Sequence, residues 1–370
     1  MGERVLITGG AGFIGSHLAD ELLAAGHQVR VLDNLTEQVH GGGRAPDYLS
    51  PDVEFLSGDM RDAEAVARSL AGMDAVVHLA ARVGVGQSMY EIDEYVDTNE
   101  RGTAVLLQAL IARPVRKLVV ASSMSIYGEG LYANSGGAPR EDVERTQAQL
   151  QEHRWDPVDE QGRPLAPLPT PESKRAQLAS VYALSKFVQE RMCLVTGRAY
   201  GIPTMALRFF NVYGPRQALS NPYTGVLAIF ASRLMNKKRP VIFEDGLQQR
   251  DFVHVQDIAR ACRLALERDC ADAALNIGSG EASTILQIAE RLALALGRND
   301  VEPEITGQFR AGDIRHCFAD ISQARRLLGY EPSVKLDDGL KELTEWLAGQ
   351  AAEDRFDEAR SELMQRGLSA

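Results

Sequence analysis

Cysteine and long hydrophobic runs are scarce in this sequence. No two of its four cysteines form a CxxC pair, which excludes a disulfide scaffold and fits the reducing cytoplasm. No apolar run approaches the ~20 residues that span a bilayer. The first residues also lack a signal-peptide pattern, so we expect a cytoplasmic protein with no membrane segment. We expect no metal site either.

An excess of positive charge is also absent. The chain has 40 Lys and Arg residues against 51 Asp and Glu residues, a formal net charge of -11. This balance excludes a broad basic surface for nucleic acid or an anionic membrane, so an anionic ligand would need a local pocket of arginines. The hydrophobic share of 45% and the charged share of 25% are ordinary for a globular chain and exclude extensive disorder.

Short apolar runs alternate with helical patterns through the first half of the chain. Strands are expected at 5–7, 29–32, 53–56, 75–79, 117–121 and 204–210, and a helix is expected at 181–200. This alternation predicts an α/β fold, a doubly wound parallel sheet of the Rossmann type with a smaller α/β lobe.

The lobes are expected to divide near residue 207. Residues 1–207 form the Rossmann lobe, and 208–370 form mainly the second lobe, with some segments returning to the first. Segment 129–179 interrupts the alternation of strands and helices. It contains six of the chain's 15 prolines and is interpreted as an insertion.

The first strand leads into a glycine-rich turn and then a helix. Gly9, Gly12 and Gly15 leave room for a pyrophosphate to approach the backbone, and the phosphates would lie on amides at the helix N-terminus. Asp33 ends the second strand, where a carboxylate accepts from a ribose 2′-hydroxyl and repels a 2′-phosphate, so NAD is favoured over NADP. Asp59 is a candidate adenine contact, or a solvated carboxylate at a strand end.

Tyr182 and Lys186 lie one helical turn apart, on one face of the expected helix. An ammonium group near a tyrosine favours its phenolate, which brings a general base towards working pH. By itself this spacing is also that of an exposed helix face. Ser123 follows a sheet strand, where its hydroxyl can bond a substrate alcohol or ketone, or merely finish the strand.

Six motifs occur along the chain in one order. They are the glycine turn, His78-Leu79-Ala80-Ala81, Ser-Ser-x-Ser-x-Tyr-Gly at 122–128, Tyr-x-x-x-Lys at 182–186, Arg208-Phe209-Phe210-Asn211-Val212-Tyr213-Gly214-Pro215 and Arg250-Asp251-Phe252-Val253-His254-Val255. In this combination the chain resembles the NAD-dependent nucleotide-sugar epimerases and dehydratases, which are extended short-chain dehydrogenases/reductases.

The resemblance implies roles for individual residues. Ser123 and Tyr182 would act on the sugar, with Tyr182 as base and Lys186 as its partner and ribose ligand. The implied NAD contacts are Gly9, Gly12, Phe13, Ile14, Gly15, Asp33, Asn34, Asp59, Met60, Leu79, Ala80, Ala81, Tyr182 and Lys186. The implied substrate contacts are Ser125, Asn211, Arg250 and Arg310, where the two arginines hold a diphosphate or form structural salt bridges instead.

The residues after Ser123 bear on the reaction. Related 4,6-dehydratases carry an Asp-Glu pair there and related decarboxylases a glutamate at the second position, whereas this chain has Met124 and Ser125. We therefore expect a 4-epimerase that passes through a 4-keto sugar and uses a dTDP- or UDP-linked substrate. Residues 155–157 and 164–167 resemble the dTDP-L-rhamnose 4-epimerase subgroup. The alternatives are a 4,6-dehydratase, an oxidoreductase and a non-catalytic dinucleotide sensor.

Two further expectations concern assembly and the insertion. The resemblance implies a homodimer that pairs helices at about 98–112 and 181–200. Segment 129–179 is expected to loop out and return as a cover that supplies Trp155, Arg140, Arg145, Arg154 or Arg163 to the sugar pocket, or to be a solvated excursion.

Overall fold

A computed structural model describes residues 2–41, 43–219, 221, 223, 225–310, 312–350 and 354–369. Its centre is a seven-stranded, wholly parallel sheet in the order β14-β9-β5-β4-β1-β2-β3. The strands are β1 Arg4–Thr8, β2 Gln28–Asp33, β3 Glu54–Ser57, β4 Ala75–His78, β5 Lys117–Ser123, β9 Thr204–Phe209 and β14 Ala273–Ile277. The predicted α/β doubly wound sheet is confirmed, and each predicted strand lies within a residue or two of an observed one.

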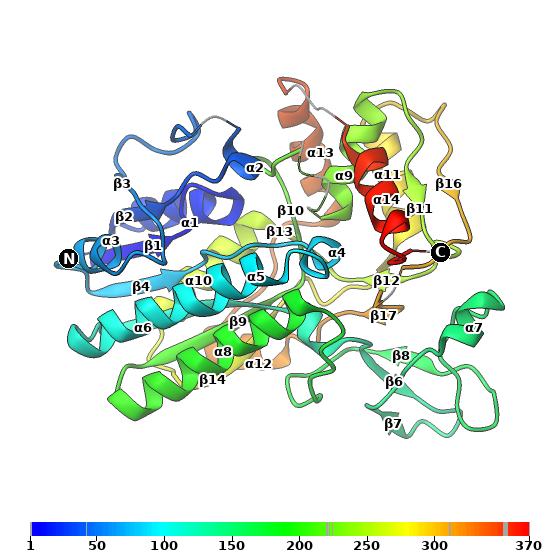
Figure 1. Ribbon diagram of the computed structural model, residues 1–370, viewed down its shortest axis with the longest axis horizontal. Helices are drawn as coiled ribbons and strands as arrows, with labels where there is room; N and C mark the ends of the chain where they lie inside the picture. The colour runs from blue at the N-terminus through cyan, green and yellow to red at the C-terminus, as the bar shows by residue number, and fades with distance from the viewer. Residues whose placement is uncertain are drawn as a thin grey trace.

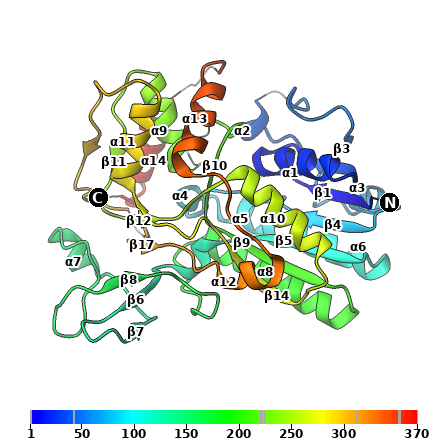
Figure 2. The same cartoon turned by 180° about the vertical axis from the view of Figure 1, so that it is seen from behind.

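Helices cover both faces of this sheet. One face carries α3 Ala63–Ser69, α6 Gly102–Ala112 and α8 Val181–Tyr200 (Figure 1), and the other carries α1 Phe13–Ala24, α10 Val255–Glu267 and α12 Ser322–Leu328 (Figure 2). Because successive side chains of a strand point to opposite faces, Leu6 packs in one apolar cluster while Val5 and Ile7 pack in the other. The sheet is therefore buried on both sides.

Helix α8 matches the predicted helix at 181–200. Ser180 caps it by accepting from the Ala183 amide, and Gly201 ends it in the left-handed region at φ 68°. The helix expected at 98–112 differs from prediction, because a π-helical turn, Val96–Arg101, precedes α6. Such turns carry an extra residue and are common at functional sites.

The second lobe holds helices α9 Val226–Met235, α11 Ile285–Ala295, α13 Leu336–Leu347 and α14 Phe356–Gln365. Its strands form small sheets, namely β10 Asn211–Tyr213 with β13 Phe252–His254, β11 Val241–Ile242 with β16 Glu304–Ile305, and β12 Gln249–Arg250 between β15 Ser283–Thr284 and β17 His316–Cys317. Short helices α2 Glu37–His40, α4 Val85–Ser88 and α5 Ile92–Tyr95 lie beside the Rossmann sheet. The lobe boundary near residue 207 stays a prediction, although β14 and α10 do return to the first lobe.

Segment 129–179 forms a small structure of its own. Its strands β6 Leu131–Ala133, β7 Pro139–Arg140 and β8 Ala166–Leu168 make an antiparallel sheet, joined by α7 Gln147–Gln151. Tyr132, Val143 and Leu165 form its apolar cluster. Figure 1 shows this unit projecting below the second lobe.

Candidate active site

A cavity of roughly 780 Å³ lies between the lobes, at the carboxyl ends of the parallel strands. This edge is where open α/β sheets bind ligands. Every site residue predicted from the sequence lines this one cavity: Gly9, Gly12, Phe13, Ile14, Gly15, Asp33, Asn34, Asp59, Met60, Leu79, Ala80, Ala81, Ser123, Ser125, Tyr182, Lys186, Asn211, Arg250 and Arg310. Tertiary structure thus brings together residues that are spread over 300 positions of the chain.

The glycine turn forms one end of the cavity. Gly9 has φ +70°, and a Cβ there would lie 2.8 Å from the Ala80 backbone, while a Cβ at Gly15 would lie 2.5 Å from the Gly9 carbonyl. Gly12 is the N-cap of α1 and supplies no side-chain cap, so no side chain of its own competes for the amides of the first turn. These features fit the pyrophosphate of a dinucleotide.

Asp33 joins the glycine turn to the second strand. Its Oδ2 accepts from the Ala11 amide at 3.0 Å and its Oδ1 from the Leu35 amide at 2.9 Å. The side chain is buried and lines the cavity, and its Oδ1 also lies 3.8 Å from His40 Nε2. A carboxylate oxygen has two acceptor positions, so a ribose hydroxyl could bond the second position of Oδ2. Asp33 therefore shapes the turn as well as lining the cavity.

Asp59 is held by its neighbours. Arg61 hydrogen-bonds it at 2.8 and 2.9 Å, and Asn34 donates to it at 3.0 Å. These bonds, led by the Arg61 side chain, lower the pKa of Asp59 to about 2 despite partial burial. The carboxylate is ionised at neutral pH and lines the cofactor end of the cavity.

Ser123 and Tyr182 meet at the centre of the cavity. The Ser123 hydroxyl accepts from the Ser125 hydroxyl at 2.9 Å and from the Ser125 amide at 3.2 Å. Burial raises the pKa of Tyr182, and a hydrogen bond with Ser123 partly offsets that rise. The tyrosine is neutral in the ligand-free protein, so it needs a nearby positive charge to act as a base.

Lys186 is buried one helical turn from Tyr182. Its ammonium donates to the Gln189 amide oxygen at 2.7 Å, and burial lowers its pKa to about 8. Gln189 in turn donates to Thr103 at 2.8 Å, and Thr103 meets His78 at 2.9 Å. Burial and the Lys186 charge lower the pKa of His78 to about 3, so the imidazole is neutral.

The sequence did not identify Gln189, Thr103 and Asn99 of this buried network. Gln189 lies on the Tyr182 and Lys186 face of α8, and its spacing of three residues from Lys186 was the available signal. Asn99 lies in the π-helical turn and is fully buried. Its amide donates to Ser185 at 2.9 Å and its oxygen accepts from the Arg82 amide at 2.7 Å, which ties α8 to the loop after β4. Nothing in the local pattern marked Asn99.

The other end of the cavity is positively charged. The Arg250 guanidinium donates to the carbonyls of Gln249 and Arg315 at 2.9 and 3.0 Å, and Arg310 pairs with Asp313 at 2.8 Å. Burial alone would raise the pKa of Asp313, but Arg310 and Arg250 outweigh it and lower that pKa to about 2. Nearby, the Asn211 Oδ1 is buried without a partner among the described residues, as expected of an atom that awaits a ligand.

The insertion does not cover this cavity. None of the residues that line it comes from 129–179, so the expectation that Trp155 or an arginine of this segment reaches the sugar pocket is wrong for this structure. Trp155 is instead buried against His153 and Phe309, with ring centroids 5.2 and 6.5 Å away. Arg140, Arg154 and Arg163 pair with carboxylates inside the segment.

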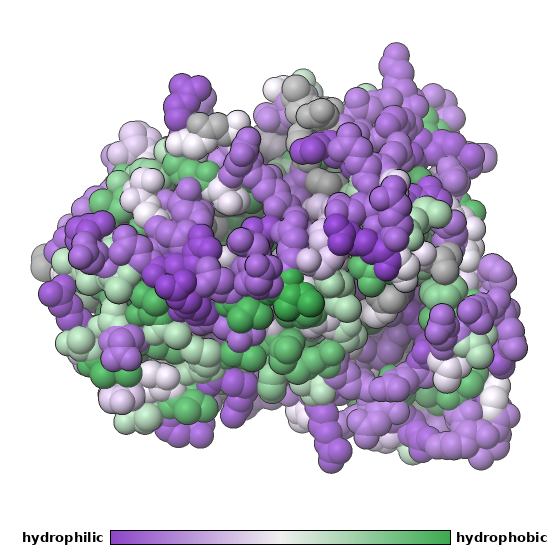
Figure 3. Space-filling model, viewed as in Figure 1, coloured by the Kyte–Doolittle hydropathy of each residue, from purple (hydrophilic) through white to green (hydrophobic). Residues whose placement is uncertain are grey.

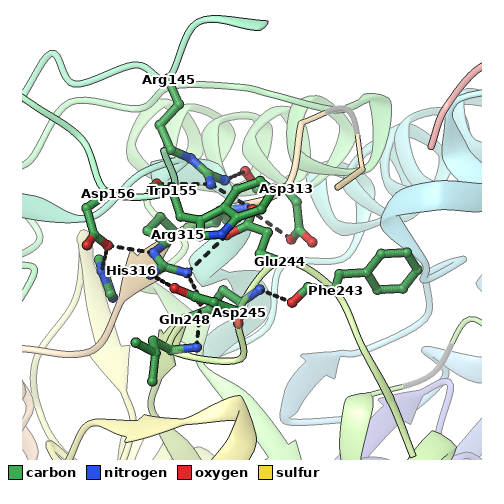
Figure 4. A network of polar contacts seen from close by, with 12 residues as sticks. Arg145, Trp155, Asp156, Phe243, Glu244, Asp245, Gln248, Asp313, Arg315 and His316 are labelled. Carbon is green, nitrogen blue, oxygen red and sulfur yellow. Dashed lines mark hydrogen bonds and ion pairs between the residues drawn. The ribbon is translucent and has the colours of Figure 1, made fainter. Parts of the chain in front are cut away.

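A buried ionic network docks the insertion on the second lobe (Figure 4). The Arg145 side chain, 3% exposed, bonds Glu244 at 2.7 Å, Glu129 at 3.1 Å and the Asp313 carbonyl at 2.9 Å. Arg315 bonds the other oxygen of Glu244 at 3.1 Å. Buried charge pairs therefore hold the segment against the loop that carries Arg310, outside the cavity, while much of its own surface stays exposed.

Comparisons with known proteins agree with this architecture. Residues 5–151 and 161–278 match the NAD dependent epimerase/dehydratase family. The dTDP-L-rhamnose 4-epimerase of Burkholderia thailandensis is 35% identical over 94% of this chain and 95% of its own. The dTDP-glucose 4,6-dehydratase of Streptomyces niveus is 30% identical over 93% and 92%. The crystal structure of Thermus thermophilus UDP-glucose 4-epimerase with NAD has a TM-score of 0.72, 31% identity and coverage of 94% and 100%.

Proposed function

Since the chain belongs to the NAD-dependent epimerase/dehydratase family, we propose that it inverts C4 of a nucleotide-linked sugar. One observation carries this choice of reaction. Among the described residues, the carboxylates that line the cavity are Asp33, Asp59, Glu94 and Asp313. Asp33 and Asp59 lie at the cofactor end, and Glu94 and Asp313 pair with arginines. The centre thus offers Ser123, Ser125 and Tyr182 but no acid–base pair for elimination.

The glycine turn, Asp33 and Lys186 would hold NAD, which would supply a reversible hydride acceptor for C4, so that hydride can return to either face of the sugar. Tyr182 removes the proton of the sugar 4-hydroxyl and later gives it back, and Ser123 hydrogen-bonds the same oxygen. Lys186, with a pKa of about 8, is mostly protonated at neutral pH. Its charge and that of the nicotinamide favour the Tyr182 phenolate, against the effect of burial.

Arg250 and Arg310 hold the diphosphate in this proposal, and Asn211 bonds the same part of the substrate. Guanidinium groups match phosphate oxygens in geometry and charge. The nucleotide is dTDP or UDP, and the sugar we favour is a 6-deoxyhexose such as that of dTDP-L-rhamnose. The similarity to the Burkholderia enzyme supports this choice.

The test is to incubate the protein with UDP-, dTDP-, GDP- and CDP-sugars and follow C4 inversion by NMR. No net NADH should accumulate, because the hydride returns to the sugar it left. Loss of water from the sugar would show a dehydratase. This is the second candidate function, because the Streptomyces relative is a 4,6-dehydratase. Stoichiometric NADH release would show an oxidoreductase, and no turnover with any sugar would leave a dinucleotide sensor.

We also propose that the protein is a cytoplasmic homodimer. Helix α8 exposes Leu184, Val195 and Tyr200 by 44, 57 and 55%, and Figure 3 shows apolar side chains gathering over α5 and α8. Exposed apolar patches of this kind mark protein interfaces. All four cysteines are free, which suits a reducing compartment, and no helix in the described ranges is long and apolar enough to cross a membrane. A monomer in light scattering at micromolar concentration would contradict the dimer.

A further inference from the structure

Helix α14, near the C-terminus, lies beside α9 and α11 of the second lobe (Figure 1) and also contacts the Rossmann lobe. On the Rossmann side, the Glu362 carboxylate accepts from the Tyr90 hydroxyl at 3.2 Å, and Arg366 stacks 4.2 Å from the Tyr90 ring. On the second-lobe side, Arg233 bonds Asp357 at 2.8 Å and stacks 5.0 Å from the Phe356 ring. Both ends of the helix are therefore anchored.

One face of α14 is a wall of the cavity. Phe356, Ala359, Arg360 and Leu363 all line it, and their spacing of three, one and three residues puts them on one side of a helix. Phe356 packs in one apolar cluster with Phe243, the ring over which Arg310 lies at 4.6 Å. None of the sequence motifs reaches this helix.

Arg360 is the charged member of this face. It donates to the Gln308 amide oxygen at 2.7 Å, and its Nε is buried without a partner among the described residues. It forms no ion pair in the described part of the chain, whereas Arg355 and Arg366 of the same segment pair with Glu358 and Glu362. A partly buried cation with an unused donor, beside a cavity, is arranged for an anion.

The surroundings of Arg360 indicate which anion. Gln308 lies two residues before Arg310, and Arg310 itself bridges to Ser369 at the end of the chain. Among the described residues from 208 onward, the charged residues that line the cavity are Arg250, Arg310 and Arg360, and Asp313 is the one acidic residue beside them. The excess of two positive charges equals the charge of the two phosphates in a nucleotide diphosphate sugar.

We propose that Arg360 is a third guanidinium that binds the substrate diphosphate, and that α14 thereby completes the substrate site. The inference rests on the proposed function for the kind of substrate but not for the reaction. Arg360 donates from its free Nε and one terminal nitrogen to phosphate oxygens. Arg310, which lies over the Phe243 ring that packs against Phe356, binds the same diphosphate.

The experiment measures the affinity of the NAD-loaded protein for dTDP, UDP, thymidine and uridine by calorimetry. Arg360→Met should weaken binding of the diphosphate that the wild-type protein prefers by about tenfold to a hundredfold, the effect of one or two charge-assisted hydrogen bonds. The matching nucleoside, which has no phosphate, should bind Arg360→Met and wild type within about twofold. Arg360→Lys should recover part of the loss, because it keeps the charge without the planar fork.

Arg355→Met is the matched control, because Arg355 is the N-cap residue of the same helix, is exposed and is not among the residues that line the cavity. It should bind both probes as the wild type does. Unchanged diphosphate affinity in Arg360→Met overturns the proposal. Equal losses for diphosphate and nucleoside also overturn it, since they would show that the variant only deforms the cavity. A wild-type protein that binds neither dTDP nor UDP overturns it as well. A selective diphosphate loss without any sugar turnover would refute the epimerase and leave Arg360 as proposed.

Discussion

Replacing Arg145 by Met should test whether the buried ionic network holds the insertion against the loop that carries Arg310. The variant removes the bonds from Arg145 to Glu244, Glu129 and the Asp313 carbonyl while keeping most of the apolar volume. Glu244 is only 1% exposed, and burial already raises its pKa although Arg145 and Arg315 oppose that rise. Without Arg145, two buried carboxylates lose a partner.

The magnitude follows from what each carboxylate retains. Glu129 keeps the Arg315 and His316 amides at 2.8 and 3.2 Å and the Tyr132 hydroxyl at 2.6 Å, and Glu244 keeps Arg315 at 3.1 Å. Arg145→Met should therefore lower the free energy of unfolding by about 3 kcal/mol, the lower end of the range for breaking a buried ion pair. At ~2.1 cal/mol/K per residue, a chain of 370 residues that unfolds as one unit would lose about 4 °C in Tm.

Thermal unfolding and hydrogen exchange of residues 129–179 provide the assay. Arg154→Met is the matched control, because Arg154 lies in the same segment with its side chain 58% exposed and, among the described residues, forms its ion pair with Glu152 alone. That exposed pair should contribute ~1 kcal/mol or less. Arg145→Met should also raise KM for the nucleotide sugar more than it lowers kcat, since the loop that carries Arg310 loses an anchor.

The double variant Arg145→Met with Glu244→Gln separates the charge pair from general packing. Removing both partners avoids leaving one charge buried alone, so the double variant should be less destabilised than the two single losses added together. The reasoning is refuted if the Tm of Arg145→Met lies within about 1 °C of that of Arg154→Met. It is also refuted if the losses of unfolding free energy in Arg145→Met and Glu244→Gln simply add up in the double variant.

Three further predictions concern the catalytic and cofactor residues. Tyr182→Phe should bind NAD normally, seen by fluorescence titration, and lose nearly all turnover; near-normal rates would exclude it as the base. Because burial lowers the pKa of Lys186 to about 8, the native protein binds fewer protons than the unfolded chain between pH 8 and 10.5. The unfolding free energy of the wild type should then rise relative to Lys186→Met across that window, while turnover falls above about pH 8; a flat difference in denaturant melts would contradict the shift. Asp33→Asn should narrow the preference for NAD over NADP, measured as a ratio of Kd values, and should unfold less easily than Asp33→Ala, which leaves the amides of Ala11 and Leu35 unpaired. Equal affinity of the wild type for both cofactors would remove Asp33 as the discriminator.

The structure also shows why segment 129–179 does not cover the cavity, as one of the two expectations had it. Its proline content indicated an ordered excursion correctly, and the positions of Ser123 and Tyr182 required both ends to lie near the site. The direction of the excursion depends on Arg145, which meets Glu244 and Asp313 about 100 and 170 residues away in the chain. Glu244 takes φ 55°, an uncommon backbone conformation for a residue other than glycine, and no sequence pattern predicts such a conformation for an acidic residue.

The sequence by itself determined the doubly wound sheet, the glycine turn with Asp33, and the placement of Tyr182 and Lys186 one turn apart on helix α8. Each of these depends on neighbours within about two dozen residues, where strand alternation, helical spacing and turn chemistry act directly. Only the tertiary structure decided that Asn99 and Gln189 tie helix α8 to its neighbours, that the insertion docks outside the cavity, and that Arg360 lines the cavity. Those contacts join segments far apart in the chain, and burial and charge pairing, which local patterns do not encode, select them.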